Sequence, residues 1–133
     1  MIRLTTLLAL SLILSGCYKK TPNDAEAIDI AKQEISMALC GSRLSACVIE
    51  ANAVAHIGAR RNDHTNKITI SFNSIKVNAE AESVNEEFIG GGLVSYDFDA
   101  KSGKTYVKEI SLWSNDGSKT IELCGHDYTF CRK

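Results

Sequence analysis

The sequence predicts an α+β domain over residues 22–133, with one N-terminal amphipathic helix packed on a curved antiparallel sheet of four to five strands. Three observations predict this class. Apolar residues recur at helical spacing at the start of the domain, and β-rich segments separated by turn residues follow. Four cysteines in two equally spaced pairs predict that disulfide bridges brace the domain. The length suits one small domain and not two.

The helix is predicted to begin at Thr21-Pro22 and to end near Leu39. A hydroxyl N-cap followed by proline is a typical start, and Asp24 and Glu26 favour the positive end of the helix dipole. Gly41 is placed as the C-terminal stop. The apolar face predicted to contact the sheet consists of Ile28, Ala31, Ile35, Ala38 and Leu39, and the polar residues that fall elsewhere are Asp29, Lys32, Gln33 and Ser36.

The first part of the sheet is less regular. Residues 47–60 are compatible with a strand or a helix, and the extended form is favoured because they show no clean helical stripe. A polar turn over Arg60 to Asn66 precedes a predicted strand over Lys67 to Val77. Its apolar residues switch from even to odd positions, which would place them on opposite faces of a regular strand. A β-bulge near Asn73-Ser74 is therefore needed to point all of them inward: Ile68, Ile70, Phe72, Ile75 and Val77.

The acidic segment from Asn78 to Glu87 is predicted to be an exposed connection or edge, and Gly90-Gly91-Gly92 permits unusual backbone angles or a sharp bend. Two alternating segments, Leu93 to Phe98 and Thr105 to Trp113, predict the clearest hairpin. A turn at Asn115-Asp116-Gly117 and a short strand over Thr120 to Cys124 follow, before a tight loop at 125–130. The order of elements resembles cystatin-like and nuclear-transport-factor-like folds, which implies a helix lying across a curved sheet.

Residues Leu14-Ser15-Gly16-Cys17 follow a short apolar segment with a basic residue near its start. This pattern resembles the lipobox of bacterial lipoproteins, and the resemblance implies that Cys17 becomes the acylated N-terminus. Tyr18 stands where an aspartate would favour the inner membrane, so the resemblance implies the outer membrane. The apolar segment is too short to span a bilayer. The alternative is an ordinary secretory signal, with Cys17 as a disulfide partner.

The resemblance divides the chain into a signal peptide over 1–16, a lipidated tether over 17–21 and the domain. It leaves an even number of cysteines to pair: Cys40, Cys47, Cys124 and Cys131. Local bridges Cys40–Cys47 and Cys124–Cys131 are the first choice, and crossed pairings stay open. Each local bridge would stabilise the fold by roughly 2.5 kcal/mol. Cys124, His126 and Cys131 could alternatively ligate zinc, but oxidation would remove the thiolates, so we expect no metal.

Composition and motifs argue against several functions. Loss of Arg3 with the signal leaves 14 Lys and Arg against 16 Asp and Glu, a balance that does not suggest nucleic acid as a partner. The chain has no nucleophile elbow, no H-E-x-x-H motif and no phosphate-binding loop, so we expect neither an enzyme nor a cofactor. Asp97 and Asp99 share one strand face and could form a carboxylate pair, although solvated residues on an outer face explain them more simply.

Aromatic residues are the remaining candidates for a site. Trp113 would either cap the core, which is the favoured interpretation, or anchor an interface. Tyr96, Tyr106 and Tyr128 allow the same two interpretations. Ser102-Gly103-x-x-Tyr106 with Trp113 and Gly117 resembles a stretch of periplasmic C-type lysozyme inhibitors, which implies inhibition of a hydrolase. Asp116 stands where that family has lysine, and an initial helix departs from its all-β barrel.

Together these features predict a non-enzymatic lipoprotein on the periplasmic side of the outer membrane that binds a protein partner. The favoured class is an immunity or inhibitor protein against an envelope-targeting toxin or hydrolase. The alternatives are a structural or assembly component of the envelope or of a secretion system, a lysozyme inhibitor, and a small-ligand binder with a cavity between helix and sheet. The candidate partner contacts are Trp113, Tyr106, Asp97 and Asp99.

Overall fold

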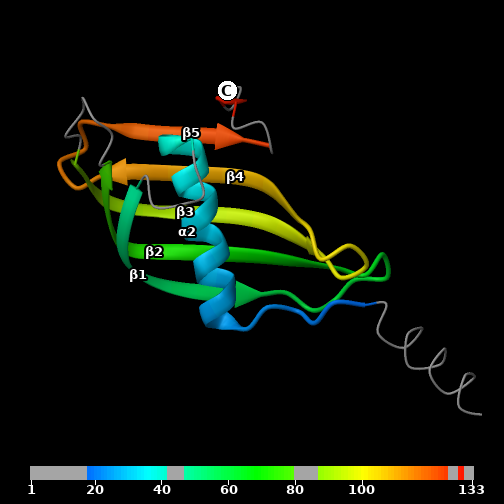
Figure 1. Ribbon diagram of the computed structural model, residues 1–133. Coiled ribbons are helices and arrows are strands. Elements are labelled where there is room, and N and C mark those ends of the chain that lie inside the picture. Colours follow the sequence, from blue (N-terminus) through cyan, green and yellow to red (C-terminus); the bar gives the residue numbers. More distant parts are fainter. Residues whose placement is uncertain (1–17, 42–46, 80–86, 126–128, 131–133) are drawn as a thin grey trace, which may run out of the picture.

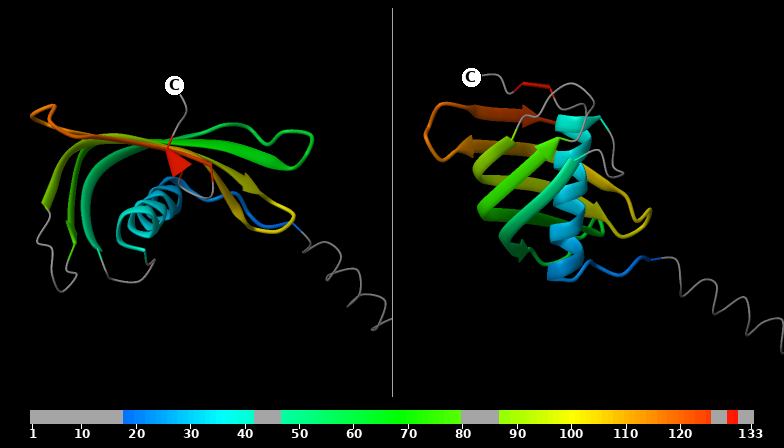
Figure 2. Two further views of the ribbon diagram at one scale, coloured as in Figure 1. Left: turned by 90° about the horizontal axis from the view of Figure 1, so that it is seen from above. Right: turned by 60° about the vertical axis from the view of Figure 1, so that its left-hand side comes forward.

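The computed structural model describes residues 18–41, 47–79, 87–125 and 129–130. In these ranges one helix, α2 (Asp24–Cys40), lies in the concave face of a curved antiparallel sheet (Figure 1 and Figure 2). The predicted α+β class is therefore confirmed. Neighbouring strands of the sheet follow one another along the chain, and the last has only two residues: β1 (Cys47–Ile57), β2 (Thr65–Ala79), β3 (Glu87–Asp99), β4 (Thr105–Ser114), β5 (Thr120–Cys124) and β6 (Thr129–Phe130).

The start of α2 differs from the prediction, because its N-cap is Asn23 and not Thr21. The Asn23 side chain accepts a hydrogen bond from the Glu26 N–H (2.9 Å), and the Glu26 carboxylate accepts one from the Asn23 N–H (3.3 Å). This reciprocal capping box satisfies two backbone donors at once, whereas a hydroxyl at Thr21 would satisfy one. The predicted end is confirmed, since Gly41 adopts a left-handed conformation (φ 68°) and its N–H bonds the Met37 carbonyl oxygen.

The buried face of α2 is also rotated from the predicted stripe. Ile28 is only half-buried, and the buried positions are Ala27, Ala31, Glu34, Ile35 and Ser36. Two alanines on this face leave room for the Tyr96 hydroxyl to reach α2, where it donates a hydrogen bond to the Ala27 carbonyl oxygen (2.9 Å). Burial, followed by the nearby charge of Glu34, raises the pKa of Tyr96 far above its usual range. The contact with β3 therefore orients the helix.

The structure shows the conformation of residues 47–57 and the register of β2. Residues 47–57 form β1, which confirms the extended interpretation, and its alanines on the inner side allow α2 to lie close. In β2 the register shifts between Phe72 and Ile75 relative to β3, which confirms the predicted bulge. The five large apolar residues of β2 all reach the core despite their change of parity: Ile68, Ile70, Phe72, Ile75 and Val77.

The three consecutive glycines do not make the predicted bend. They lie inside β3, and none of them has a positive φ angle. Glycine is needed at these positions because the neighbouring strand β4 lies very close to them. A Cβ atom at Gly90 would collide with the Trp113 carbonyl oxygen and lie 2.9 Å from the Ser114 Cα. Glycine is needed here for the approach of the neighbouring backbone and not for an unusual conformation.

The disulfide brace is not seen within the described part of the chain, where no two cysteines lie at bonding distance. Cys131 and the side chain of Cys47 lie outside it, as do His126 and Tyr128. No group of three potential metal ligands occurs within the described ranges. His56 is exposed on β1, and the ring of His64 packs against Tyr18 with centroids 4.7 Å apart. The cysteine pairing stays a prediction.

Candidate interaction surface on the convex face of the sheet

The convex face of the sheet is the natural place to look for a site, because α2 covers only the concave face (Figure 2). Residues that alternate with the core positions point to this side. Several of them are large and apolar, which is unusual for solvated positions on a small domain. Ile89 is 47% exposed, Val54 and Trp113 are each 46% exposed, and Leu93 is half-buried. We call these four residues the Trp113 face.

Trp113 lies on this surface and not in the core, contrary to the favoured prediction. A register shift between Ser95 and Tyr96 in the β3–β4 pairing turns Ile110 and Leu112 inward, so Trp113 must point outward. Its cross-strand partner is Gly91, and a Cβ atom there would lie only 2.9 Å from the indole Nε1. The indole therefore covers a bare stretch of β3 backbone and leaves its other face to solvent.

The neighbours of Trp113 extend the apolar surface across the sheet. Ile89 and Leu93 lie diagonally beside it, two residues to either side of Gly91. Leu93 pairs with Ser71, and Ser71 pairs with Val54 on β1, so one row joins three strands. Ile89 also borders two hollows, of about 340 and 400 Å³, lined by Glu50, Ala51, Asn52, Ser74, Ile75, Lys76, Phe88, Ser114, Asn115, Asp116, Ser118 and Lys119. Polar residues thus border the apolar surface on the side of Ile89.

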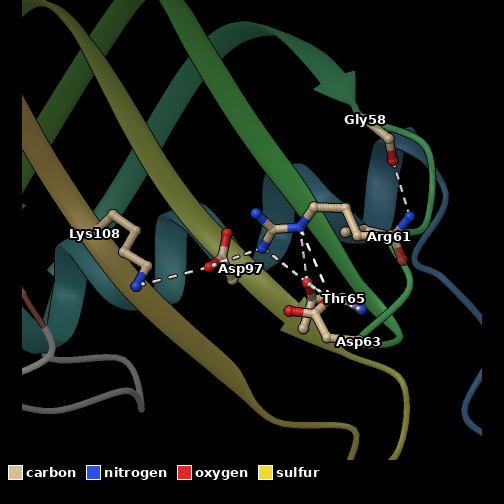
Figure 3. A network of polar contacts seen from close by, with 7 residues as sticks. Gly58, Arg61, Asp63, Thr65, Asp97 and Lys108 are labelled. Atoms are coloured by element: carbon tan, nitrogen blue, oxygen red, sulfur yellow. Dashed lines mark hydrogen bonds and ion pairs between the residues drawn. The ribbon is translucent and has the colours of Figure 1, made fainter.

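The other predicted contacts lie on the same face but at the opposite end. Asp97 pairs directly with Tyr106, which is 44% exposed. The Asp97 carboxylate lies 3.4 Å from Arg61 and 3.7 Å from Lys108, and Arg61 also donates hydrogen bonds to the Thr65 hydroxyl (Figure 3). Exposed ion pairs of this kind contribute little stability. They do fix the side chains at this end of the sheet.

Asp99 is the last residue of β3, and its side chain holds the β3–β4 turn. Its carboxylate accepts hydrogen bonds from the Lys101 N–H (2.9 Å) and the Ser102 hydroxyl (3.0 Å). These two bonds lower the pKa of Asp99, the backbone bond more strongly. Asp97 contacts two cations, so the two carboxylates belong to a charged surface at this end of the sheet.

The structure therefore separates the four predicted contacts into two groups. Asp97, Asp99 and Tyr106 lie near the β3–β4 turn, and Trp113 lies about 25 Å away along β4. The prediction missed Ile89, Val54 and Leu93. Ile89 had a readable signal, since it adjoins Phe88 on a strand, and adjacent strand residues point to opposite faces.

The β4–β5 turn at the rim of the Trp113 face depends on Asp116. Its carboxylate accepts hydrogen bonds from the Ser118 hydroxyl, the Ser118 N–H and the Ser114 hydroxyl. These bonds, led by that of the Ser118 hydroxyl, lower the pKa of Asp116 from 3.8 to about 2. Because the folded pKa is depressed, the stabilisation is present above pH 3.8 and is lost as the pH falls through about 2.

We expect an NMR titration of the Asp116 carboxyl carbon to show a midpoint near pH 2. Ser118→Ala removes the largest cause of the shift and should move this midpoint toward 3.8. Asp99 is the control, since its hydrogen bonds come from Lys101 and Ser102 and should be unaffected. An unchanged Asp116 midpoint in the variant would contradict the assigned role of Ser118.

Comparison with known proteins finds no matching protein family, no similar curated protein and no similar solved structure. The chain is thus defined by its own features: an α+β domain with a helix in the concave face of a curved sheet, and an exposed apolar convex face. Within the described ranges no helix is long and apolar enough to cross a membrane. Residues 1–17, with the predicted signal peptide and Cys17, lie outside these ranges.

Proposed function

We propose that this protein is a non-enzymatic lipoprotein, anchored through Cys17 to the outer membrane and facing the periplasm, whose Trp113 face binds a protein partner. The favoured class is an immunity or inhibitor protein that neutralises an envelope-targeting toxin or hydrolase. One observation carries the proposal, namely an indole held open to solvent over Gly91, with Ile89 and Leu93 beside it. Exposed tryptophan within a polar rim is typical of the centres of protein interfaces.

The packing between helix and sheet favours a protein partner over a small ligand. A small-ligand site of this architecture would need a cavity between the two layers. Ile35, Phe72 and Tyr96 fill this space and are almost completely buried. The hollows beside Ile89 lie on the outer surface. A broad, convex surface fits the face of another protein better than it fits a small ligand, because ligand sites are concave.

The disulfide brace and the finer fold likeness belong to the same proposal. Local bridges Cys40–Cys47 and Cys124–Cys131 would join the end of α2 to the start of β1 and the end of β5 to the C-terminal residues. One fact supports them, namely that neither Cys40 nor Cys124 is without a partner. Bridges in these positions and a helix lying across a curved sheet suit the exported cystatin-like or nuclear-transport-factor-like scaffold proposed for this chain.

The test is protection against the toxin or hydrolase in a strain that lacks the gene. The wild-type gene should restore resistance, and Trp113→Ala should fail to do so. With the purified toxin or hydrolase, titration calorimetry should show affinity weakened about 30-fold for Trp113→Ala, as expected for an interface hot spot. Ile89→Asp, which places a charge beside the indole, should weaken binding at least as much.

Met37→Ala is the matched control, since Met37 is an exposed apolar residue on the helix side of the domain. It should protect and bind like the wild type. Circular dichroism of each variant separates loss of binding from loss of folding. The proposal is wrong if the deletion leaves sensitivity unchanged, or if folded Trp113→Ala and Ile89→Asp variants bind and protect normally.

A further inference from the structure

The segment between the predicted anchor and the helix is bound to the domain, although the sequence predicts a simple tether over 17–21. The Lys19 N–H donates a hydrogen bond to the Ala100 carbonyl oxygen (2.6 Å). The Arg60 guanidinium bonds both the Lys19 carbonyl oxygen (3.3 Å) and the Thr21 hydroxyl (2.9 Å). Thr21 in turn donates to Asn66, a buried residue. These contacts tie the segment to the β1–β2 and β3–β4 turns.

Side-chain packing adds to this attachment at the end nearest Cys17. The Tyr18 ring packs on His64 of the β1–β2 turn. The Lys19 side chain crosses Gly103 of the β3–β4 turn, where a Cβ atom would lie 2.9 Å from the Lys19 Cγ. The bound segment therefore begins at Tyr18, directly after Cys17. A lipid on Cys17 would hold the two turns at the membrane surface, because hardly any free chain separates them.

The end of the domain that carries these turns is rich in positive charge. Its exposed cations are Lys19, Lys20, Arg60, Arg61, Lys101 and Lys104, and they outnumber its carboxylates, Asp63, Asp97 and Asp99. Asp63 and Asp99 accept hydrogen bonds within their own turns, and Asp97 pairs with Arg61. A basic surface held beside a bilayer is attracted to anionic lipids, by roughly fivefold in binding per Lys or Arg near the surface. The charge thus complements a phospholipid surface.

We propose that the bound segment and the two turns form a membrane-contacting end, which seats the domain on anionic phospholipid headgroups in one fixed orientation. This inference rests on the lipid anchor at Cys17 proposed above. The inference also fixes where the Trp113 face lies relative to the membrane, because Trp113 is at the far end of β4, about 25 Å from the β3–β4 turn. The partner-binding surface is then held away from the lipid and open to the periplasm.

Because Trp113 is the only tryptophan, its fluorescence reports the orientation directly. The lipidated mature protein, which begins at Cys17, is placed in phosphatidylcholine vesicles containing phosphatidylglycerol and a headgroup-attached quencher. Trp113 should be almost unquenched. In a Trp113→Phe background, Lys101→Trp moves the fluorophore to the β3–β4 turn and should be quenched several-fold more strongly. Equal quenching at the two positions in protein that floats with the vesicles would overturn the orientation.

Two neighbouring arginines provide matched variants for the attachment itself. Arg60→Ala removes the bonds to Lys19 and Thr21, whereas Arg61→Ala removes only contacts within the sheet end. Trypsin cleavage after Lys19 or Lys20, followed by mass spectrometry, should release the domain from vesicles about tenfold faster for Arg60→Ala than for Arg61→Ala. Equal release rates for the two variants would contradict the claim that Arg60 holds the segment against the domain. Failure of the wild-type protein to float would instead contradict the lipid anchor, and with it the orientation.

Discussion

Gly90→Ala is expected to destabilise the fold by about 3 kcal/mol or more, the largest effect of any single methyl group in this sheet. The added Cβ would collide with the Trp113 carbonyl oxygen and press on the Ser114 Cα. Both are backbone atoms of the paired strand, so no side-chain rotation can relieve the overlap. The β3–β4 pairing must open locally, which also removes the support for the indole. Urea unfolding followed by circular dichroism measures the loss.

Ile89→Ala is the control for this prediction, because Ile89 adjoins Gly90 but its side chain is half exposed on the convex face. It should change the free energy of unfolding by less than about 1 kcal/mol. If Gly90→Ala unfolds at the wild-type urea concentration, β3 and β4 do not approach each other as closely as the structure shows. Gly90→Ala and Ile89→Asp also separate the two roles of this region, because the first is expected to affect stability and the second is expected to affect partner binding.

The second large effect is expected at Ile35, where alanine should cost about 3 kcal/mol of unfolding free energy. Ile35 is completely buried and is the only large apolar side chain among the fully buried residues of α2. Its neighbours Ala31 and Ala38, one turn before and after it on that face, are too short to fill the space. The cavity left between helix and sheet would therefore persist, and the cost includes the lost contacts as well as the lost apolar burial.

Met37→Ala in the same helix isolates this effect from helix propensity. Met37 is exposed, so its replacement removes little buried surface, and alanine is itself a good helix former. We expect a change within about 0.5 kcal/mol for Met37→Ala. Similar unfolding midpoints for the two variants would show that α2 does not pack on the sheet through Ile35. Both midpoints come from the same urea titration.

Sequence patterns were most reliable where local rules act alone. Gly41 ends the helix because glycine adopts the left-handed conformation without a steric penalty, and this holds in any tertiary setting. The bulge in β2 followed from parity, since the apolar residues on either side of Asn73-Ser74 can share a core only if one extra residue is accommodated. The predicted start of the helix at Thr21-Pro22 was wrong, because Asn23 is the N-cap and the Thr21 hydroxyl bonds Asn66 instead.

The candidate site was found by residue type but was misplaced. Trp113 was singled out because tryptophan is scarce and large, yet the core was its favoured location. Its outward position depends on the register of β3 against β4. The shift at Ser95/Tyr96 does leave a mark in β4, because the apolar residues that face the core change parity between Val107 and Ile110. Likewise, the alternation that makes Asp97 and Asp99 share a face held, but their separate roles depend on Arg61 and Lys101.

By itself, the sequence determined the α+β class, the order of the elements and the end of the helix, because periodicity and turn residues act over a few neighbouring positions. It also carries the lipobox pattern on which the proposed anchor rests. Tertiary structure alone decided that the glycines of β3 serve close packing, that Trp113 is open to solvent, and that Lys19 and Thr21 are tied to distant turns. The reason is physical: strand register and long-range contacts join residues far apart in the chain, and a local pattern does not encode which partners meet.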